Sequence, residues 1–373
     1  MRFLFIAPRL HSNQHDIIEG LLNQGNDVEY LVINKLGNFS YKNTQFIKRS
    51  ILMWIIEEVL LFKKSKKYRD HYRQIFYIPS IIQIVDMLLR KKYDIIIFRN
   101  RNMVSLFYNI FALIFSKSIR ILYNQTPITE NYSKKHLKIF FTLFPKVRFS
   151  PVIKSDYFSS NSKINKNSYF LPFIAVNKLP KNSFYINGAV NILSVGKFRP
   201  YKNHEILIES IKEIRNIEKI HVTIVGQVFD EEDEKYYINI KEKIIQYNLE
   251  DIIDLKKNVS FNQMNEIYCQ NDIFVLTSHK EIASISLIEA MSFGLLPIST
   301  NLNGTATYIP DNLGYIFETD NSESLRKCLS KAISIKKDDL RIKSMLIQQH
   351  INENYNFSRY YETLLEIINS IKN

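Results

Sequence analysis

The segment "IFVLTSHKEIASISLIEAMSFGLLPIST", residues 273–300, decides the fold of this chain. It begins and ends with short apolar runs, at 273–278 and 295–300, which are typical of strands buried on both faces of a parallel sheet. Between them, Ser284 suits a helix N-cap and Gly294 suits the position that follows a helix C-terminus. A strand, a helix and a strand in this order predict a βαβ unit.

The same alternation extends over the rest of the sequence. The segment 172–189 contains Pro, Asn, Gly and Ser without a clear period, and it separates two stretches of strand–helix rhythm. We therefore predict an α/β protein with two Rossmann-like, doubly wound parallel-sheet domains, at 1–180 and 187–355, that face a central cleft. The strands expected in the first domain are 2–7, 27–33, 93–98 and 119–124, and those expected in the second are 190–196, 221–226, 273–278 and 295–300.

Length and composition are those of an ordinary globular protein of 373 residues, with 46% hydrophobic and 23% charged residues. Two widely separated cysteines fit a reducing cytosol. The N-terminus reads as a first strand and not as a signal peptide. The most apolar window, 103–115, has 13 residues and is too short to span a bilayer.

The positive charge is concentrated in the first half of the chain. Residues 1–185 hold 29 Lys and Arg against 11 Asp and Glu, a balance of +18, whereas residues 186–373 hold 21 against 26, a balance of −5. Basic surfaces attract phosphates, nucleic acid or anionic lipid. The plain alternative is that lysines only decorate solvated faces.

Two acidic residues, Glu281 and Glu289, lie in the otherwise apolar opening segment. The helix that begins after Ser284 directs free amides toward an anion. A carboxylate beside an anion site suits hydroxyl groups, such as a ribose diol or a sugar. One diphosphate between two hydroxyl-rich groups describes a nucleotide-sugar. The alternative is that Glu281 is a surface loop residue and that Glu289 pairs with a lysine.

The loop after the strand at 190–196 carries three cations. Gly196 closes the strand, and Lys197, Arg199 and Lys202 follow before the next helix. Cations at the carboxyl end of a strand suit a phosphate or a diphosphate. The glycine spacing of a P-loop is absent, so this loop alone also fits a simple basic surface.

Together these motifs resemble the retaining family-4 glycosyltransferases. Glu281 and Glu289, with seven residues between, resemble the family's E-x7-E motif, and "SVGKFRPYKN" resembles its basic loop; the likeness covers about 187–320. It implies the GT-B fold, with the acceptor-side domain first and the donor-side domain second, and a C-terminal helix, 356–373, that crosses back to the first domain. The donor-binding residues that it implies are Gly196, Lys197, Arg199, Lys202, Ser284, Ser286, Glu289 and Thr305, with Glu281 on the transferred sugar.

Some positions depart from the family pattern. Lys197 stands where arginine is usual, and Thr307 stands where a glutamate is frequent. Near Gln125 the family often has a histidine, which this chain lacks. The remaining acceptor-side candidates follow predicted strands: His11, which joins Glu281 as a catalytic candidate, and Asn13, Arg99, Arg101 and Gln125.

We predict neither a metal nor a cofactor. Lysines and helix amides can stabilise a nucleoside diphosphate leaving group as fixed electrostatics. The chain contains no D-x-D sequence, the acidic pair with which another transferase architecture holds a divalent ion.

The segment 51–73 favours a membrane partner. It has a bulky apolar part and then Lys63, Lys64, Lys66, Lys67, Arg69, His71 and Arg73, and 138–149 repeats the theme. Such segments suit an anionic membrane surface and a lipid-linked acceptor, although a core helix with a solvated tail fits equally. No nucleic-acid recognition motif is present.

The predicted function is a retaining sugar transferase that uses a nucleotide-sugar donor and a glycan or lipid-linked acceptor to build cell-surface polysaccharide or glycoconjugate. It would act in the cytoplasm, peripherally on the inner face of the plasma membrane. The alternatives are a nucleotide-sugar epimerase and a catalytically inactive GT-B subunit that binds glycan or an active transferase.

Overall fold

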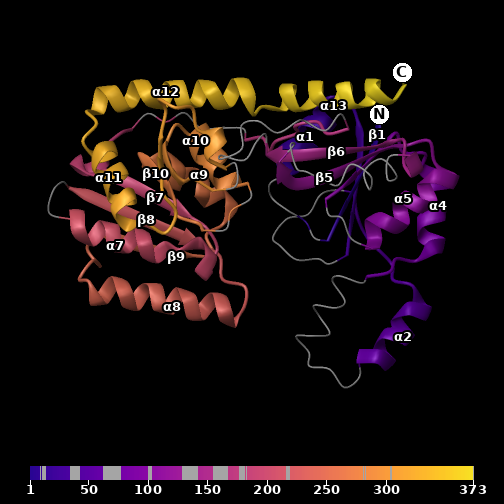
Figure 1. Cartoon of the computed structure of the whole chain (residues 1–373), viewed down its shortest axis with the longest axis horizontal. Helices are drawn as coiled ribbons and strands as arrows, with labels where there is room; N and C mark the ends of the chain where they lie inside the picture. The colour runs from indigo at the N-terminus through magenta and orange to yellow at the C-terminus, as the bar shows by residue number, and fades with distance from the viewer. Residues whose placement is uncertain are drawn as a thin grey trace. The chain divides into compact units, whose positions relative to one another are not determined.

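The chain forms two compact units, each built around its own six-stranded sheet (Figure 1). The computed structural model describes residues 1–8, 10, 14–33, 43–61, 77–99, 103–127, 142–153, 167–175, 181, 183–215, 219–279, 281, 283–302 and 305–372. Unit 1 comprises Met1–Val152, Ser162–Pro172 and Tyr360–Asn373, and unit 2 comprises Ile153–Asn161 and Phe173–Arg359. The predicted α/β class with two separate sheets is confirmed.

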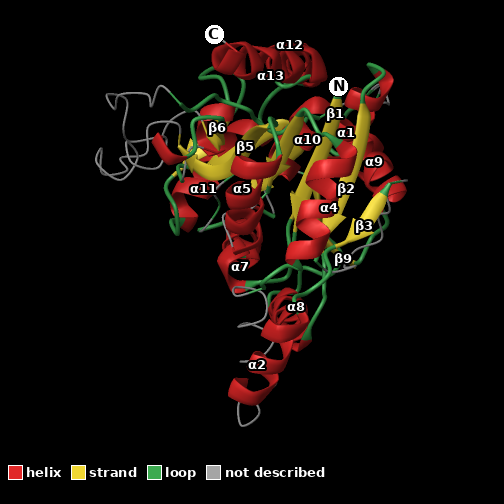
Figure 2. Cartoon of the chain, turned by 90° about the vertical axis from the view of Figure 1, so that its right-hand side faces the viewer, coloured by secondary structure: helices red, strands yellow, loops and turns green. Residues whose placement is uncertain are grey.

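The sheet of unit 1 has the order β3-β2-β1-β4-β5-β6. The pairs β2–β3, β1–β2, β1–β4 and β4–β5 are parallel. The strands are β1 (Arg2–Ala7), β2 (Asp27–Val32), β3 (Thr44–Phe46), β4 (Ile95–Phe98), β5 (Ile119–Pro127) and β6 (Val147–Ile153), and the helices are α1 (His15–Asn23), α2 (Ile51–Leu61), α4 (Ile81–Lys91), α5 (Met103–Phe115) and most of α13 (Phe357–Lys372). Figure 2 shows the strands in yellow.

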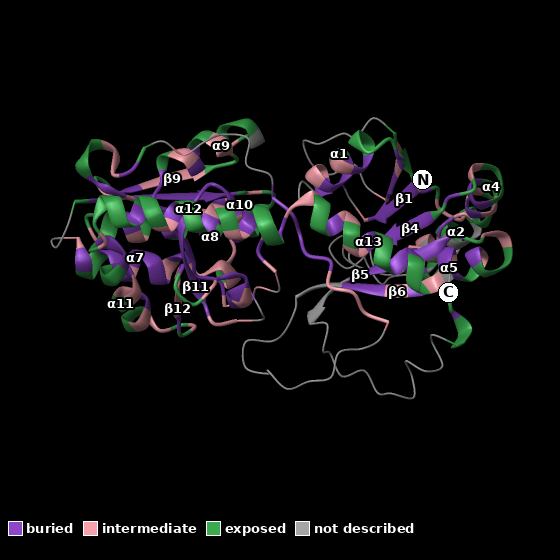
Figure 3. Ribbon diagram, turned by 90° about the horizontal axis from the view of Figure 1, so that it is seen from above, coloured by how far each residue is buried: buried purple, intermediate pink, exposed green. Residues whose placement is uncertain are grey.

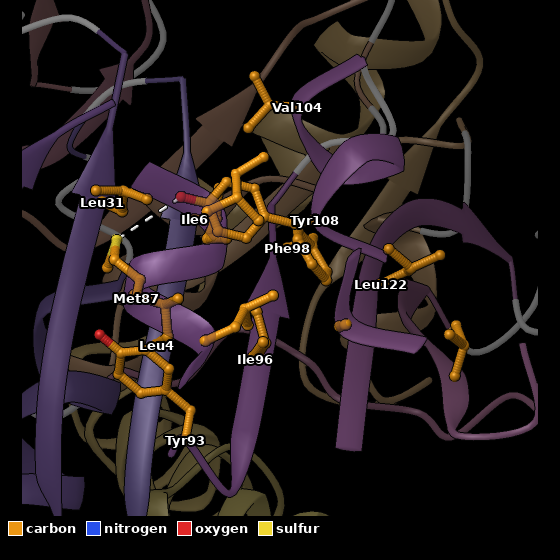
Figure 4. Packing of buried hydrophobic residues seen from close by; sticks show 14 of the residues in the cluster. Leu4, Ile6, Leu31, Met87, Tyr93, Ile96, Phe98, Val104, Tyr108 and Leu122 are labelled. Carbon is orange, nitrogen blue, oxygen red and sulfur yellow. Dashed lines mark hydrogen bonds between the residues drawn. The ribbon is translucent and has the colours of Figure 1, made fainter. Parts of the chain in front are cut away.

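One hydrophobic cluster holds the sheet of unit 1 against α4 and α5 (Figure 4). Leu4, Ile96 and Phe98 of the strands pack with Met87 of α4 and Tyr108 of α5. The Tyr108 hydroxyl donates to the Met87 sulfur at 3.8 Å. The apolar window 103–115 is thus a helix with one buried face. No helix within the described ranges has both the length and the apolar character that a bilayer span requires.

The sheet of unit 2 has the order β12-β11-β10-β7-β8-β9, and all its neighbouring strands are parallel. The strands are β7 (Val190–Val195), β8 (Ile220–Gly226), β9 (Ile253–Lys257), β10 (Ile273–Leu276), β11 (Leu296–Thr300) and β12 (Tyr315–Phe317). The helices are α7 (His204–Ile214), α8 (Glu231–Gln246), α9 (Phe261–Gln270), α10 (Ile285–Ser292), α11 (Ser322–Ile333) and α12 (Lys337–Asn354), with the 3-10 turns η2 (Ile186–Gly188), η3 (Pro200–Lys202) and η4 (Thr305–Tyr308). The strands are largely buried, and the exposed residues lie mainly on the helices and loops (Figure 3).

The direction of winding in unit 2 reverses between β7 and β10. From β7 the sheet grows to β8 and β9 on one side, and from β10 it grows to β11 and β12 on the other. In an open parallel sheet this reversal leaves a crevice at the carboxyl ends of the two central strands, where ligands bind. The loops that follow β7 and β10 are therefore the first place to look for a site.

The helix that follows β10 has the ends predicted from the sequence. The Ser284 hydroxyl accepts from the Leu287 N–H at 3.4 Å as the N-cap of α10. Gly294 has φ +78° just after the helix, a conformation that favours glycine. The capping residues thus fix where α10 begins, and its first turn faces the end of β7.

Candidate functional site

Two loops meet at the carboxyl ends of β7 and β10. The Ser286 hydroxyl, in the first turn of α10, donates to the Val195 carbonyl at the end of β7 at 3.3 Å. The Thr277 hydroxyl donates to the Lys202 carbonyl at 2.8 Å, and the His279 N–H donates to the Tyr201 carbonyl at 3.0 Å. These bonds hold loops 196–203 and 277–284 side by side, as expected at a switch point.

The centre of the site is an ion pair between Lys202 and Glu281. The side chains are 13% and 15% exposed, and the Ser278 hydroxyl lies 3.4 Å from Glu281 Oε2. Gly196 makes room for this lysine, because a Cβ on that residue would lie 3.1 Å from Lys202 Cδ. The sequence placed both residues in the site, and the structure adds that they bind each other.

Glu289 is oriented by a buried tyrosine. The Tyr268 hydroxyl donates to Glu289 Oε2 at 2.9 Å, and the Tyr268 ring stacks on Phe293 at 5.1 Å between centroids. Burial, followed by the nearby Glu289 carboxylate, raises the pKa of the Tyr268 hydroxyl well above its ordinary value. The tyrosine therefore stays a neutral donor and holds the carboxylate in place. Sequence reasoning missed Tyr268, since an isolated tyrosine in a helix carries no signal.

Two serine hydroxyls lie at the start of α10, and a buried threonine hydroxyl follows β11. Ser284 and Ser286 have their hydroxyl oxygens 3.0 Å apart. Thr305 begins η4 after β11 and is buried, and its hydroxyl makes no hydrogen bond within the part of the chain that the structure describes. A buried hydroxyl without a partner is costly, so a ligand atom at this position would be favoured.

Lys197 and Arg199 take different positions although they flank one residue. The Lys197 ammonium lies 5.2 Å from the centre of the Phe229 ring. The Arg199 guanidinium forms ion pairs with three carboxylates at the start of α8, those of Asp230, Glu232 and Asp233. Arg199 is thus committed to unit 2 itself, and its charge is neutralised there.

The acidic run 230–235 forms the start of α8. The Asp230 carboxylate accepts from the N–H groups of Glu232 at 3.1 Å and Asp233 at 3.0 Å as an N-cap. Carboxylates stabilise a helix N-terminus, and here they also bind Arg199.

Phe198 anchors the loop that carries the cations. The ring is fully buried and lies 5.0 Å from the Tyr237 ring and 5.6 Å from the His204 ring. A Cβ on Gly226 would lie 2.5 Å from the Phe198 ring, so only glycine fits at the end of β8. An aromatic residue between cations in a loop was the available signal, and sequence reasoning did not use it.

The acceptor-side candidates are only partly visible. Arg99 follows β4 and is buried; its N–H donates to the Ile6 carbonyl at 2.9 Å, and its guanidinium lies 4.1 Å from the centre of the Tyr123 ring. Burial raises the pKa of the nearby Tyr30 hydroxyl to about 12, and Arg99 opposes the rise. Gln125 lies in β5, where only the backbone is described. His11, Asn13 and Arg101 lie outside the described residues.

No group of three or more His, Cys, Asp or Glu side chains with the arrangement of a metal site occurs among the residues that can be described. The absence of a metal from the reaction therefore stays a prediction.

The sequence of unit 2 matches a known protein family. Residues 178–346 match the family model of the glycosyl transferases group 1. The chain is 25% identical over 121 residues to a GDP-Man:Man(3)GlcNAc(2)-PP-Dol alpha-1,2-mannosyltransferase of Dictyostelium discoideum. The aligned residues cover 30% of this chain and 24% of that protein. It is 26% identical over 137 residues to a mannosylfructose-phosphate synthase of Agrobacterium fabrum, and this alignment covers 36% of this chain and 30% of the relative. The matches thus span only about a quarter to a third of these curated relatives.

Solved structures share the fold of the whole chain. A glycosyltransferase from Rickettsia africae superposes with a TM-score of 0.73 at 16% identity and covers 100% of this chain and 99% of its own. The Anabaena protein HepE in complex with UDP superposes with a TM-score of 0.74 at 12% identity and covers 99% and 100%. The predicted GT-B fold is therefore confirmed. Residues 178–346 of this chain are thus similar to the glycosyl transferases group 1 family.

Proposed function

We propose that this protein is a retaining glycosyltransferase that moves a sugar from a nucleotide-sugar to a glycan or lipid-linked acceptor, in the synthesis of cell-surface polysaccharide or glycoconjugate. The observation that carries the proposal is the meeting of Lys202, Glu281 and Ser286 at the switch point of the sheet whose sequence matches the family, with Glu289 further along the same helix as Ser286. Cation, carboxylates, hydroxyls and helix amides together suit a diphosphate between two hydroxyl-bearing rings.

Each group then has a distinct task. The amides at the start of α10 and the ammonium groups of Lys197 and Lys202 bind the diphosphate. Glu289, oriented by Tyr268, accepts hydrogen bonds from the two hydroxyls of the pentose. The buried Thr305 hydroxyl gains a partner from the donor.

The Lys202–Glu281 pair gives the site an exchange mechanism. A bound diphosphate carries more negative charge than one carboxylate, so it binds the Lys202 ammonium more strongly than Glu281 does. Glu281 is then released to accept hydrogen bonds from the hydroxyls of the transferred sugar. The lysine therefore remains paired throughout, and no buried charge is left alone.

Departure of the nucleoside diphosphate is the step that this site is arranged to help. Negative charge grows on the leaving oxygen, and fixed lysines and helix amides stabilise it without reorganising. We propose that this electrostatic support replaces a metal ion, that the transfer retains the anomeric configuration, and that His11 and Glu281 are the catalytic candidates.

The relatives and structural neighbours support a donor and an acceptor of these classes. HepE has been solved with UDP and with glucose. An Arabidopsis thaliana relative, 25% identical over 146 residues, is a phosphatidylinositol N-acetylglucosaminyltransferase subunit. We therefore propose action at the cytoplasmic face of a membrane.

A thermal unfolding screen against UDP, GDP, CMP and dTDP tests the donor site. At 100 times its Kd a ligand stabilises by about 2.7 kcal/mol, which raises the Tm of a unit of this size by about 5–10 °C. The shift should be lost in Glu289→Gln and kept in the matched control Glu250→Gln, an exposed residue of the same unit. A labelled donor then separates transfer from epimerisation.

A catalytically inactive subunit is the second candidate. The neutralisation of Lys202 by Glu281 favours it, because a site without a donor is already balanced in charge. If none of the four nucleotides shifts the Tm, this candidate replaces the transferase.

A further inference from the structure

The helix α2 of unit 1 exposes an unusual amount of apolar side chain. Ile51, Trp54, Ile55 and Val59 are 50–77% exposed, all within one helix of 11 residues. Exposed apolar residues are normal when they are scattered, but a cluster marks a surface that another body covers.

The four side chains lie on one side of the helix. Their spacings of three, four and eight residues place them within one stripe of an α-helix, and the half-buried Glu58 falls in the same stripe. Leu61, the last residue of the helix, is buried, and the segment before the helix is tied to the rest of unit 1 by the hydrogen bond from the Ser50 N–H to the Ile78 carbonyl at 3.1 Å. In Figures 1 and 2, α2 extends away from the strands of its own unit.

As far as the structure describes it, this helix is too short to span a bilayer. Eleven residues span about 16 Å, roughly half of the ~30 Å hydrocarbon core. A helix of this length with an apolar stripe can instead lie in the plane of the bilayer, with that stripe between the headgroups and the acyl chains. Trp54 suits this position, because an indole ring has an apolar body and a polar N–H.

Charge decides between a lipid surface and a second copy of the chain. The half that contains α2 has a balance of +18, and four lysines, at positions 63, 64, 66 and 67, follow the helix directly in the sequence. A second copy would bring the same positive charge against itself. An anionic bilayer offers the opposite charge and an apolar interior at the same place.

We propose that α2 inserts Ile51, Trp54, Ile55 and Val59 into the headgroup–acyl boundary of an anionic bilayer. The helix follows β3 and therefore leaves the carboxyl edge of the unit 1 sheet, the same edge as the loop that Arg99 begins after β4. A lipid-linked acceptor would thus meet the protein on the side of the acceptor candidates. This inference builds on the membrane-side function proposed above, but its test needs no nucleotide, so the two proposals fail separately.

The experiment uses the fact that Trp54 is the only tryptophan in the chain. The full chain is titrated with vesicles of phosphatidylcholine, with and without phosphatidylglycerol, while tryptophan emission and flotation are followed. With the anionic vesicles we expect emission at shorter wavelength, quenching by brominated acyl chains and salt-sensitive flotation. The triple variant Ile51→Gln, Ile55→Gln, Val59→Gln should weaken binding roughly 100-fold, since about two full apolar side chains no longer enter the lipid.

The matched control is Ile342→Gln with Met345→Gln, two apolar residues of α12 in unit 2 that are 59% and 64% exposed. This control should bind vesicles as the unchanged chain does. Unchanged Trp54 emission at saturating anionic lipid would overturn the proposal, as would equal flotation of the triple variant. An emission shift that depends on protein concentration without lipid would assign the surface to a second copy instead.

Discussion

Replacing Glu281 by glutamine should lower the stability of the ligand-free protein and raise its affinity for a nucleoside diphosphate. The variant leaves Lys202 charged in a position where its side chain is 13% exposed. Removing one partner of a fully buried pair costs about 3–5 kcal/mol. Because residual solvent reaches this pair and the lysine chain is flexible, we expect about 2 kcal/mol, or a Tm lower by about 4–8 °C.

The same substitution should favour binding of the nucleotide. In the unchanged protein the diphosphate must displace the Glu281 carboxylate from Lys202, whereas in Glu281→Gln the ammonium is available at once. We expect nucleotide affinity to rise up to about tenfold, equivalent to about 1.4 kcal/mol. Calorimetric titration with the nucleotide that stabilises the unchanged chain measures this change. Lys202→Met should lower the affinity instead, and its combination with Glu281→Gln should cost less stability than the two separate losses predict.

Two results would refute this reasoning. If Lys202→Met binds the nucleotide as well as the unchanged protein does, the lysine does not contact the diphosphate. If Glu281→Gln binds it more weakly, Glu281 is a direct ligand of the nucleotide and not a competitor for the lysine. Sugar transfer should fall in both variants.

Three further changes test the surrounding structure. Arg199→Met should lower the free energy of unfolding by about 2–3 kcal/mol, because the buried Asp233 carboxylate loses its cation, while the Kd for nucleotide measured by titration stays unchanged. Burial holds the pKa of His204 at about 4, below the ordinary 6.5, so the unfolded chain takes up the proton first as pH falls. The free energy of unfolding should therefore fall by about 2 kcal/mol between pH 7 and pH 5. When it is measured by urea unfolding at several pH values, it should fall less steeply with decreasing pH in His204→Phe than in the unchanged chain. An equal fall in both proteins would contradict this. Gly196→Ala should push Lys202 aside and weaken nucleotide binding, with a stability change under about 1 kcal/mol, and equal affinity would show that the loop has spare room.

The sequence predicted the central strands and α10 because they carry strong local signals. Continuous apolar runs identify β7, β10 and β11, and Ser284 and Gly294 limit the helix. The strands β9 and β12 were not predicted, since one is a polar edge strand with Lys256 and Lys257 and the other has three residues. Edge strands depend on their neighbour more than on their own composition.

The site was only half accessible from the sequence. Motif order placed Lys202, Glu281 and Glu289 together, but it could not show that Lys202 and Glu281 pair across 79 residues. Arg199 looked equivalent to its neighbouring lysines, and only the fold shows that it binds the start of α8. Side-chain direction in a loop depends on contacts that are distant in sequence, so residue type alone does not determine it.

The burial of Phe198 makes the loop that presents Lys197 and Lys202 part of the folded core. Its backbone is ordered once, during folding, and a ligand that arrives later meets charges already in position. Immobilising one long side chain on association typically costs about 0.5–1.5 kcal/mol, and much of that cost is absent here for the backbone that carries them. A chain with serine in place of Phe198 would have to organise this segment at each encounter, and capture of its ligand would then be slower and weaker.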